Sequence, residues 1–242
     1  MEKYLILVIL HIIGDFYFQT SKVVRCKNAK IGAMCGACKE CENRLWFNWK
    51  YLFIHSMLYI VPFFCLYYIA GRRGTTVIIA VLFVTHIFID TGACYLIKKM
   101  KQIVVFVLDQ TLHIGILYMA FPLLNLNCNI DIHYKTLKVI FLGLMLIMPC
   151  SIIINKLIQD IYPDSEEIEM FDVGSMIGVM ERILTVIFAC FDNFPAIAII
   201  ITVKTWARTN DLKETEFRNK YLLGTLSSLV LALLVFLIYK SI

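Results

Sequence analysis

Apolar segments long enough to cross a lipid bilayer recur along this chain and constrain its fold more than any other feature. A membrane-spanning helix needs about 20 mainly apolar residues, with wide tolerance, and lipid requires the backbone to satisfy its own hydrogen bonds. With 60% hydrophobic and 17% charged residues, the chain is too apolar for a soluble domain. The sequence predicts an all-α, polytopic membrane protein with eight spans: Tyr4–Gln19, Trp49–Ala70, Thr75–Ile97, Gln102–Leu124, Thr136–Ile154, Val173–Phe191, Phe194–Trp206 and Tyr221–Tyr239.

The first, sixth and seventh of these spans depart from a regular crossing. The first and seventh are short, and the sixth and seventh form either two crossings or one tight hairpin. His11 and Asp15 interrupt the first apolar run, which has no small-residue cleavage site, so we expect a retained span and not a signal peptide. The chain, 1–242, is expected to form a single transmembrane domain with a cysteine-containing cytoplasmic loop at 20–48 and an acidic cytoplasmic loop at 155–172.

Lysines and arginines are unevenly divided between the two sides that these spans define. One side holds the loops 20–48, 98–101, 155–172 and 207–220, which carry most of the basic residues. Strongly basic loops stay in the cytoplasm, so this side is predicted to be cytoplasmic and both chain termini to lie outside. The opposite side has few basic residues: Lys3, Arg72, Arg73, Lys135, Lys138 and Lys240.

Pairs of histidine and aspartate, each four residues apart, lie inside the apolar spans. This spacing places both members of a pair on one face of a helix. Burying charge in hydrocarbon costs at least about 2.5–3.5 kcal/mol per residue, so these side chains need a bound metal or a dense hydrogen-bond network. We expect them to share one layer between the bilayer centre and the cytoplasmic boundary: His11 with Asp15, His86 with Asp90, Asp109 with His113, and His55 on the second span.

Imidazole and carboxylate together suit Zn²⁺, Mn²⁺ or Fe²⁺. The predicted ligands of one or two such divalent ions are His11, Asp15, His86, Asp90, Asp109 and His113. His55 is either a seventh ligand or a proton shuttle, and Gln19 and Gln110 are candidates for orienting a ligand carboxylate. The alternatives are a structural polar network without metal and a path for protons, since intramembrane histidine and aspartate serve both.

Two further groups of residues each have two possible roles. Glu181, beside Arg182 in the sixth span, acts either as a further metal ligand or general base, or as part of a salt bridge that fixes this span. The candidate catalytic residues are therefore Asp109, His55 and Glu181. Lys204 and Arg208 lie on one face of the seventh span, where they either hold an anionic headgroup or phosphate or only anchor the helix at the membrane surface.

The cytoplasmic loop at 20–48 contains four of the nine cysteines: Cys26, Cys35, Cys38 and Cys41. In a reducing compartment, four thiolates are compatible with a separate structural zinc site. The spacing differs from the standard pair of C-x₂-C motifs, so free thiols in a loop are the alternative.

The chain contains, in order, HIIGDFYFQ at 11–19, the helix around His55, HIFID at 86–90 followed by Lys98, DQTLH at 109–113, and then IGVMER, KTWAR and YLLGTLSS. This order of motifs resembles the domain of unknown function 3307 family, which comprises bacterial multi-span membrane proteins. The resemblance runs from His11 to Ser228 and implies the bacterial cytoplasmic membrane. The cysteine-rich loop departs from the family pattern. HIFID is also similar to an element of inner-membrane metal-dependent hydrolases of the LexA-regulated kind, which implies metal-assisted hydrolysis with His86 and Asp90.

The hypothesis that joins these observations is a membrane-embedded, metal-dependent hydrolase. It would cleave a phosphate or ester bond of a lipid or small amphiphile from the cytoplasmic side. The rival is a transporter or channel for protons or divalent metal, whose outward path would use Tyr59, Thr75, Thr76 and Tyr118. A non-catalytic membrane sensor subunit is the third alternative. No nucleic-acid-binding module is recognised in the sequence, and the oligomeric state stays open, with a homo-oligomer as one option.

Overall fold

The computed structural model describes residues 2–19, 49–69, 72–97, 99–123, 133–163 and 172–242. Each predicted span corresponds to a helical segment, so the all-α fold is confirmed. The segments are α1 (Glu2–Ile12) with the π-helix η1 (Ile13–Tyr17), α3 (Trp49–Ile60) with η3 (Val61–Cys65) and α4 (Leu66–Ile69), α5 (Arg72–Leu96), α6 (Gln102–Ala120) with η4 (Phe121–Leu123), α7 (Tyr134–Ile161), α8 (Val173–Cys190), α9 (Phe194–Ala207), and η5 (Asp211–Lys213) with α10 (Thr215–Ser241).

Six of the described helical segments are long and apolar enough to cross a membrane, which makes this a multi-pass membrane protein. They are Trp49–Tyr68, Gly74–Leu96, Gln102–Ala120, Tyr134–Ile161, Val173–Cys190 and Thr215–Ser241. Large apolar side chains such as Phe88 and Met119 point outward, 71% and 76% exposed. A surface of this kind suits lipid and would be unfavourable in water.

Two helices extend by more than one turn past the apolar segments from which they were predicted. α7 continues to Ile161, into the segment expected to be an acidic loop, and α10 begins at Thr215 instead of Tyr221. The added turns carry charged residues, among them Lys156 and Glu216. Hydropathy marks the part of a helix that suits hydrocarbon, whereas the hydrogen-bonded helix continues into the polar region beside it.

The sixth and seventh predicted spans form a helix hairpin. α8 and α9 pack against each other, and the turn between them contains Asp192 with a φ of 54°, a left-handed conformation that aspartate tolerates. α9 has 14 residues, so at about 1.5 Å rise per residue it is about 21 Å long. That is shorter than the hydrocarbon thickness of about 30 Å.

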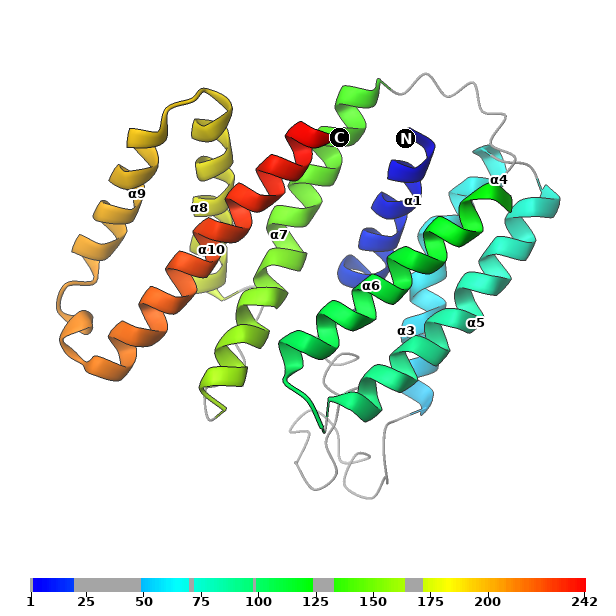
Figure 1. Cartoon of the computed structure of the whole chain (residues 1–242), viewed down its shortest axis with the longest axis horizontal. Helices are drawn as coiled ribbons and strands as arrows, with labels where there is room; N and C mark the ends of the chain where they lie inside the picture. The colour runs from blue at the N-terminus through cyan, green and yellow to red at the C-terminus, as the bar shows by residue number, and fades with distance from the viewer. Residues whose placement is uncertain (1, 20–48, 70–71, 98, 124–132, 164–171) are drawn as a thin grey trace. The chain divides into compact units, whose positions relative to one another are not determined.

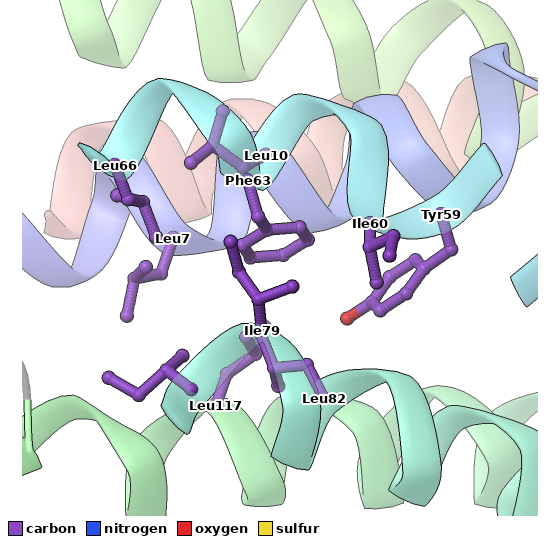
Figure 2. Close-up of a cluster of buried hydrophobic side chains, with 10 residues drawn as sticks. Leu7, Leu10, Tyr59, Ile60, Phe63, Leu66, Ile79, Leu82 and Leu117 are labelled. Carbon is purple, nitrogen blue, oxygen red and sulfur yellow. The ribbon is translucent and has the colours of Figure 1, made fainter. Parts of the chain in front are cut away.

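The chain divides into two compact units, Met1–Leu137 and Lys138–Ile242, which we describe separately. In the first unit, α5 packs against both α3 and α6, and the α1–η1 segment packs against α3 and α6. A core of buried apolar side chains joins these segments (Figure 2): Leu7, Leu10, Tyr59, Ile60, Phe63, Leu66, Ile78, Ile79, Leu82 and Leu117. Because lipid is as apolar as these side chains, close packing stabilises this core more than exclusion of water does.

The second unit contains α7 from Lys138 onward, α8, α9 and α10 (Figure 1). Side chains from three of these helices form its apolar core: Leu142, Leu146 and Cys150 of α7, Val186 and Ala189 of α8, and Ala232, Val235 and Phe236 of α10. Buried next to this core is Arg182 of α8, which is only 3% exposed. A buried arginine in a membrane helix is unusual, because placing its charge in hydrocarbon is costly.

Candidate metal centre

The first element of the site is the π-helix η1, which carries Asp15 at the end of α1. η1 widens the helix by one residue per turn just after His11, and π-helical turns of this kind often occur at functional sites. Gly14 allows η1 to lie against α3, since a Cβ atom at this position would be 2.3 Å from the carbonyl oxygen of Tyr59. The backbone approach therefore requires glycine and brings Asp15 into the unit interior, where it is 5% exposed.

Seven ionisable side chains from four helical segments meet in the first unit, and we refer to them as the His/Asp cluster. They are His11 and Asp15 of α1–η1, His55 of α3, His86 and Asp90 of α5, and Asp109 and His113 of α6. All are buried except Asp109, whose side chain is 14% exposed. The cluster uses four of the five histidines of the chain. Such a concentration of ionisable groups in apolar surroundings is costly unless the groups compensate one another or bind an ion.

Asp15 is held from two sides. Its Oδ1 atom lies 3.1 Å from Nε2 of His55, and its Oδ2 atom accepts a hydrogen bond of 2.7 Å from the side-chain amide of Gln110. The same amide nitrogen donates to Oδ2 of Asp109 at 3.1 Å. The amide oxygen of Gln110, Oε1, lies 3.1 Å from Nε2 of His11. Gln110 thus links two carboxylates and one imidazole through a single side chain.

Asp90 lies among three histidines. One carboxylate oxygen, Oδ2, is 3.4 Å from Nε2 of His55 and 3.9 Å from Nε2 of His86. The other, Oδ1, is 3.6 Å from Nε2 of His113, which is equally distant from Oδ1 of Asp109. The rings of His86 and His113 are also close, with centroids 4.6 Å apart. Asp90 is therefore the carboxylate with the most imidazole neighbours.

The donor atoms of the cluster fit a divalent metal ion. Two groups, Asp15–His55–His86 and His86–Asp90–His113, each offer ligand atoms within 4.8 Å of one another. Tetrahedral ligands at about 2.1 Å from zinc are separated by about 3.4 Å, which is close to the separations of 3.1–3.9 Å between these atoms. Three buried atoms, Nδ1 of His55, Nε2 of His86 and Oδ1 of Asp109, have no hydrogen-bond partner among the described residues. Nε2 of His86 is thus available to an ion, and both groups contain His86.

A comparison with protein families identifies the segment that holds this cluster. The model of a family described as "Protein of unknown function (DUF3307)" matches residues 4–141. The chain belongs to the DUF3307 family. The match includes all seven residues of the His/Asp cluster and nearly coincides with the first unit. Neither the search of curated proteins nor the search of solved structures gave a match.

The cluster of this DUF3307 protein also includes an aromatic residue that sequence patterns did not assign to it. The Tyr59 ring stacks on the His86 ring with centroids 3.9 Å apart, and its hydroxyl lies 3.3 Å from Nδ1 of His11. Tyr59 follows His55 by four residues and so shares its helix face. That spacing is the signal that could have identified it. From the sequence alone, Tyr59 is instead a candidate for the outward path of a transporter.

The remaining predicted residues of this DUF3307 chain lie elsewhere. Gln19 follows η1 and is partly exposed. Glu181 belongs to the second unit, where its carboxylate accepts a 2.6 Å hydrogen bond from Lys204, so it does form a salt bridge, with α9 and not with Arg182. Its role as ligand or base stays a prediction. The four loop cysteines and the zinc site predicted for them lie outside the described residues: Cys26, Cys35, Cys38 and Cys41.

Proposed function

We propose that the His/Asp cluster binds one or two divalent metal ions and that the protein is a membrane-embedded hydrolase. Its substrate would be a phosphate or ester bond of a lipid or small amphiphile that enters from the cytoplasmic side. The observation that carries this proposal is the donor set itself, in which buried imidazole and carboxylate atoms converge and the buried Nε2 atom of His86 has no hydrogen-bond partner among the described residues. A dication would compensate the negative charge of Asp15, Asp90 and Asp109 in apolar surroundings.

Different residues of the cluster would have different roles in hydrolysis. When bound, the metal polarises water and the phosphoryl or carbonyl oxygen of the substrate. His55 can hold a proton at Nε2, because this atom lies 3.1 Å from Asp15 and 3.4 Å from Asp90. Asp109 is the most exposed member of the cluster, so it is the carboxylate best placed to meet an incoming substrate.

The apolar core of the first unit favours a hydrolase over a transporter. On α1 and α5 the core residues come before the cluster residues in the sequence, as Leu82 comes before His86. On α3 and α6 they come after the cluster residues, as Leu117 comes after His113. Because α1, α3, α5 and α6 alternate in direction (Figure 1), these sequence positions put the core on one side of the cluster. Thr75, considered for an outward path, is buried and donates to the carbonyl oxygen of Leu66. A hydrolase needs one entrance, whereas a carrier must open to both faces in turn.

Elemental analysis of protein purified without chelator tests the metal centre. We expect wild-type protein to retain metal and the His86→Ala and Asp90→Asn variants to lose it. His133→Ala is the matched control, because His133 is exposed and lies outside the cluster. Full metal occupancy in both cluster variants would contradict the proposal. Hydrolysis of short-chain phosphate and ester amphiphiles should follow metal content across the same four proteins.

Accessibility from the two sides separates the hydrolase from the transporter. Single cysteines at Ile89 and Leu112, in a background without native thiols, should react with membrane-impermeant reagents from the cytoplasmic face alone. The predicted orientation rests on the basic residues near Lys99 and Lys101. Labelling from the outer face, particularly labelling that changes with added metal or pH, would favour the transporter.

A further inference from the structure

A second polar site lies in the second unit. It is a hollow of about 20 Å³ between α8, α9 and α10, which has room for one water-sized group, such as a single oxygen of an oxyanion. Apolar residues form part of its wall, and the polar residues that line it are Glu181, Arg182, Thr185, Lys204, Thr225 and Ser228. These residues come from three helices, so their polar groups face the hollow from different directions.

Arg182 brings a positive charge to this hollow without a carboxylate partner. Its Nε atom donates to the carbonyl oxygen of Leu146 at 2.7 Å, and Nη2 donates to Ser151 and to the carbonyl oxygen of Ile147. Nη1 donates to Oγ of Ser228 at 3.3 Å. Of the five N–H groups of a guanidinium, these bonds use four, and no ion pair among the described residues includes Arg182. One N–H of Nη1 has no partner among the described residues, and the charge is compensated there only by these hydrogen bonds and by a longer-range interaction with Glu181.

Two hydroxyl groups in the wall are also unusual. Helical threonines often donate to a carbonyl of the preceding turn, as Thr202 and Thr205 of α9 do. Thr185 and Thr225 are 5% and 9% exposed, yet neither hydroxyl makes a hydrogen bond to a described residue. Hydroxyl donors of this kind, together with a buried guanidinium, are the groups that bind an oxyanion.

The charges favour an anion over a cation. Arg182 and Lys204 contribute two positive charges and Glu181 one negative charge, which leaves a net charge of +1 at the hollow. Lys204 and Glu181 neutralise each other at 2.6 Å. Because the donors come from three helices and not from one plane, they suit tetrahedral oxygens better than a flat carboxylate.

The geometry points to a phosphate-binding pocket in the second unit, formed by Arg182, Thr185, Thr225 and Ser228 with Lys204 at its edge. The phosphate could be inorganic phosphate or the headgroup of an anionic lipid, which share this chemistry. This pocket is independent of the metal centre, since none of its residues belongs to the His/Asp cluster. A protein without bound metal should therefore still bind phosphate here.

Titration calorimetry of the 242-residue chain tests the pocket. The probes are inorganic phosphate, and phosphatidylcholine nanodiscs with or without phosphatidic acid. We expect Thr185→Val to weaken binding about tenfold or more, the size typical of a lost hydrogen bond to a charged group. This variant should fold normally, because the Thr185 hydroxyl has no hydrogen-bond partner to lose in the described part of the chain. Thr202→Val, at an exposed position of α9, is the matched control and should bind like wild type.

The Glu181→Gln variant distinguishes a phosphate-binding pocket from a group of residues with a structural role only, because only a binding pocket should bind phosphate more tightly after this change. Removing the only carboxylate in the wall of the hollow should strengthen phosphate binding, because it removes repulsion and releases Lys204 from its ion pair. Binding of inorganic phosphate that depends on Thr185 would identify a free ion as the ligand, and a response only to phosphatidic acid would identify a lipid headgroup. The proposal is overturned if wild type binds neither probe, or if Thr185→Val and Thr202→Val bind equally.

Discussion

The ring of Tyr59 lies flat against the ring of His86, with planes 19° apart, while its hydroxyl reaches His11. One side chain of α3 thus fixes imidazoles from two other helices, α1 and α5. This arrangement has two separable parts, the stacked ring and the hydroxyl.

Substitutions of Tyr59 should separate these two parts. Tyr59→Phe keeps the ring and is expected to lower the free energy of unfolding by about 0.5–1.5 kcal/mol through the lost hydrogen bond. Tyr59→Ala also removes the ring and should cost about 3–5 kcal/mol. Thermal unfolding of the detergent-solubilised protein measures both. Equal losses in the two variants would mean that the stacked ring contributes nothing.

Gly14→Ala should disrupt the contact between η1 and α3. The new methyl group would overlap the carbonyl oxygen of Tyr59, and forced overpacking usually costs about 1–3 kcal/mol. We expect lower thermal stability and weaker metal binding, since Asp15 must move with the backbone. Gly92→Ala in α5 is the control, because, apart from its chain neighbours and the nearby backbone of its own helix, no described atom lies within 4 Å of the added Cβ. If both variants behave alike, the close approach at Gly14 is not needed.

Gln110→Glu should destabilise the metal-free protein. The amide that donates to Asp15 and Asp109 would be replaced by an acceptor, which leaves buried groups unpaired at a cost of about 1–3 kcal/mol. Saturating metal should recover part of the loss, because a cation offsets the added negative charge. Gln102→Glu, at the first residue of α6, is the control and should be neutral, since acidic residues suit helix N-termini. A loss that metal does not reduce would argue against an ion near Gln110.

Removal of metal should lower the melting temperature of wild-type protein. A ligand at a hundredfold excess over its Kd stabilises the folded state by about 2.7 kcal/mol. Chelation should therefore reduce stability, and added zinc or manganese should restore it. Asp90→Asn should respond to neither treatment. An unchanged wild-type melting curve would instead indicate a hydrogen-bond network without metal.

Arg182→Lys should be poorly tolerated although it preserves the charge. Arg182 donates to the Leu146 and Ile147 carbonyls just before Pro149, which interrupts the hydrogen bonds of α7. A lysine cannot reproduce the planar fork that reaches α7 and Ser228 together, so we expect a loss of about 1–3 kcal/mol. Arg218→Lys, at an exposed position of α10, is the control for thermal unfolding.

Helical periodicity explains which parts of the cluster could be predicted. His86 and Asp90 lie on a regular α-helix, so a spacing of four residues is enough to place them together. Asp15 lies on a π-helix, and its position depends on the contact of Gly14 with α3, a tertiary feature that no local pattern contains. Gln110 was expected to contact a carboxylate, and it contacts those of Asp15 and Asp109.

Other features could not be predicted because they depend on packing between helices. Tyr59 resembles any aromatic residue of an apolar span, and only the fold stacks it on His86. The charges of Glu181 and Arg182 suggested that these neighbours would pair, whereas α9 supplies Lys204 to the first and α7 supplies carbonyls to the second. Hydropathy located α7 but not its end, since the helix continues past the apolar segment to Ile161.

The apolar core beside the His/Asp cluster also bears on the leakage of charge across the membrane. Ionisable groups within a membrane protein can serve as a stopping point for protons, and each charge that crosses 100 mV dissipates about 2.3 kcal/mol. Leu7, Phe63, Ile78 and Leu117 are each at most 1% exposed and fill the first unit on one side of these groups. A membrane that holds many copies of this protein should therefore keep whatever electrical potential it carries.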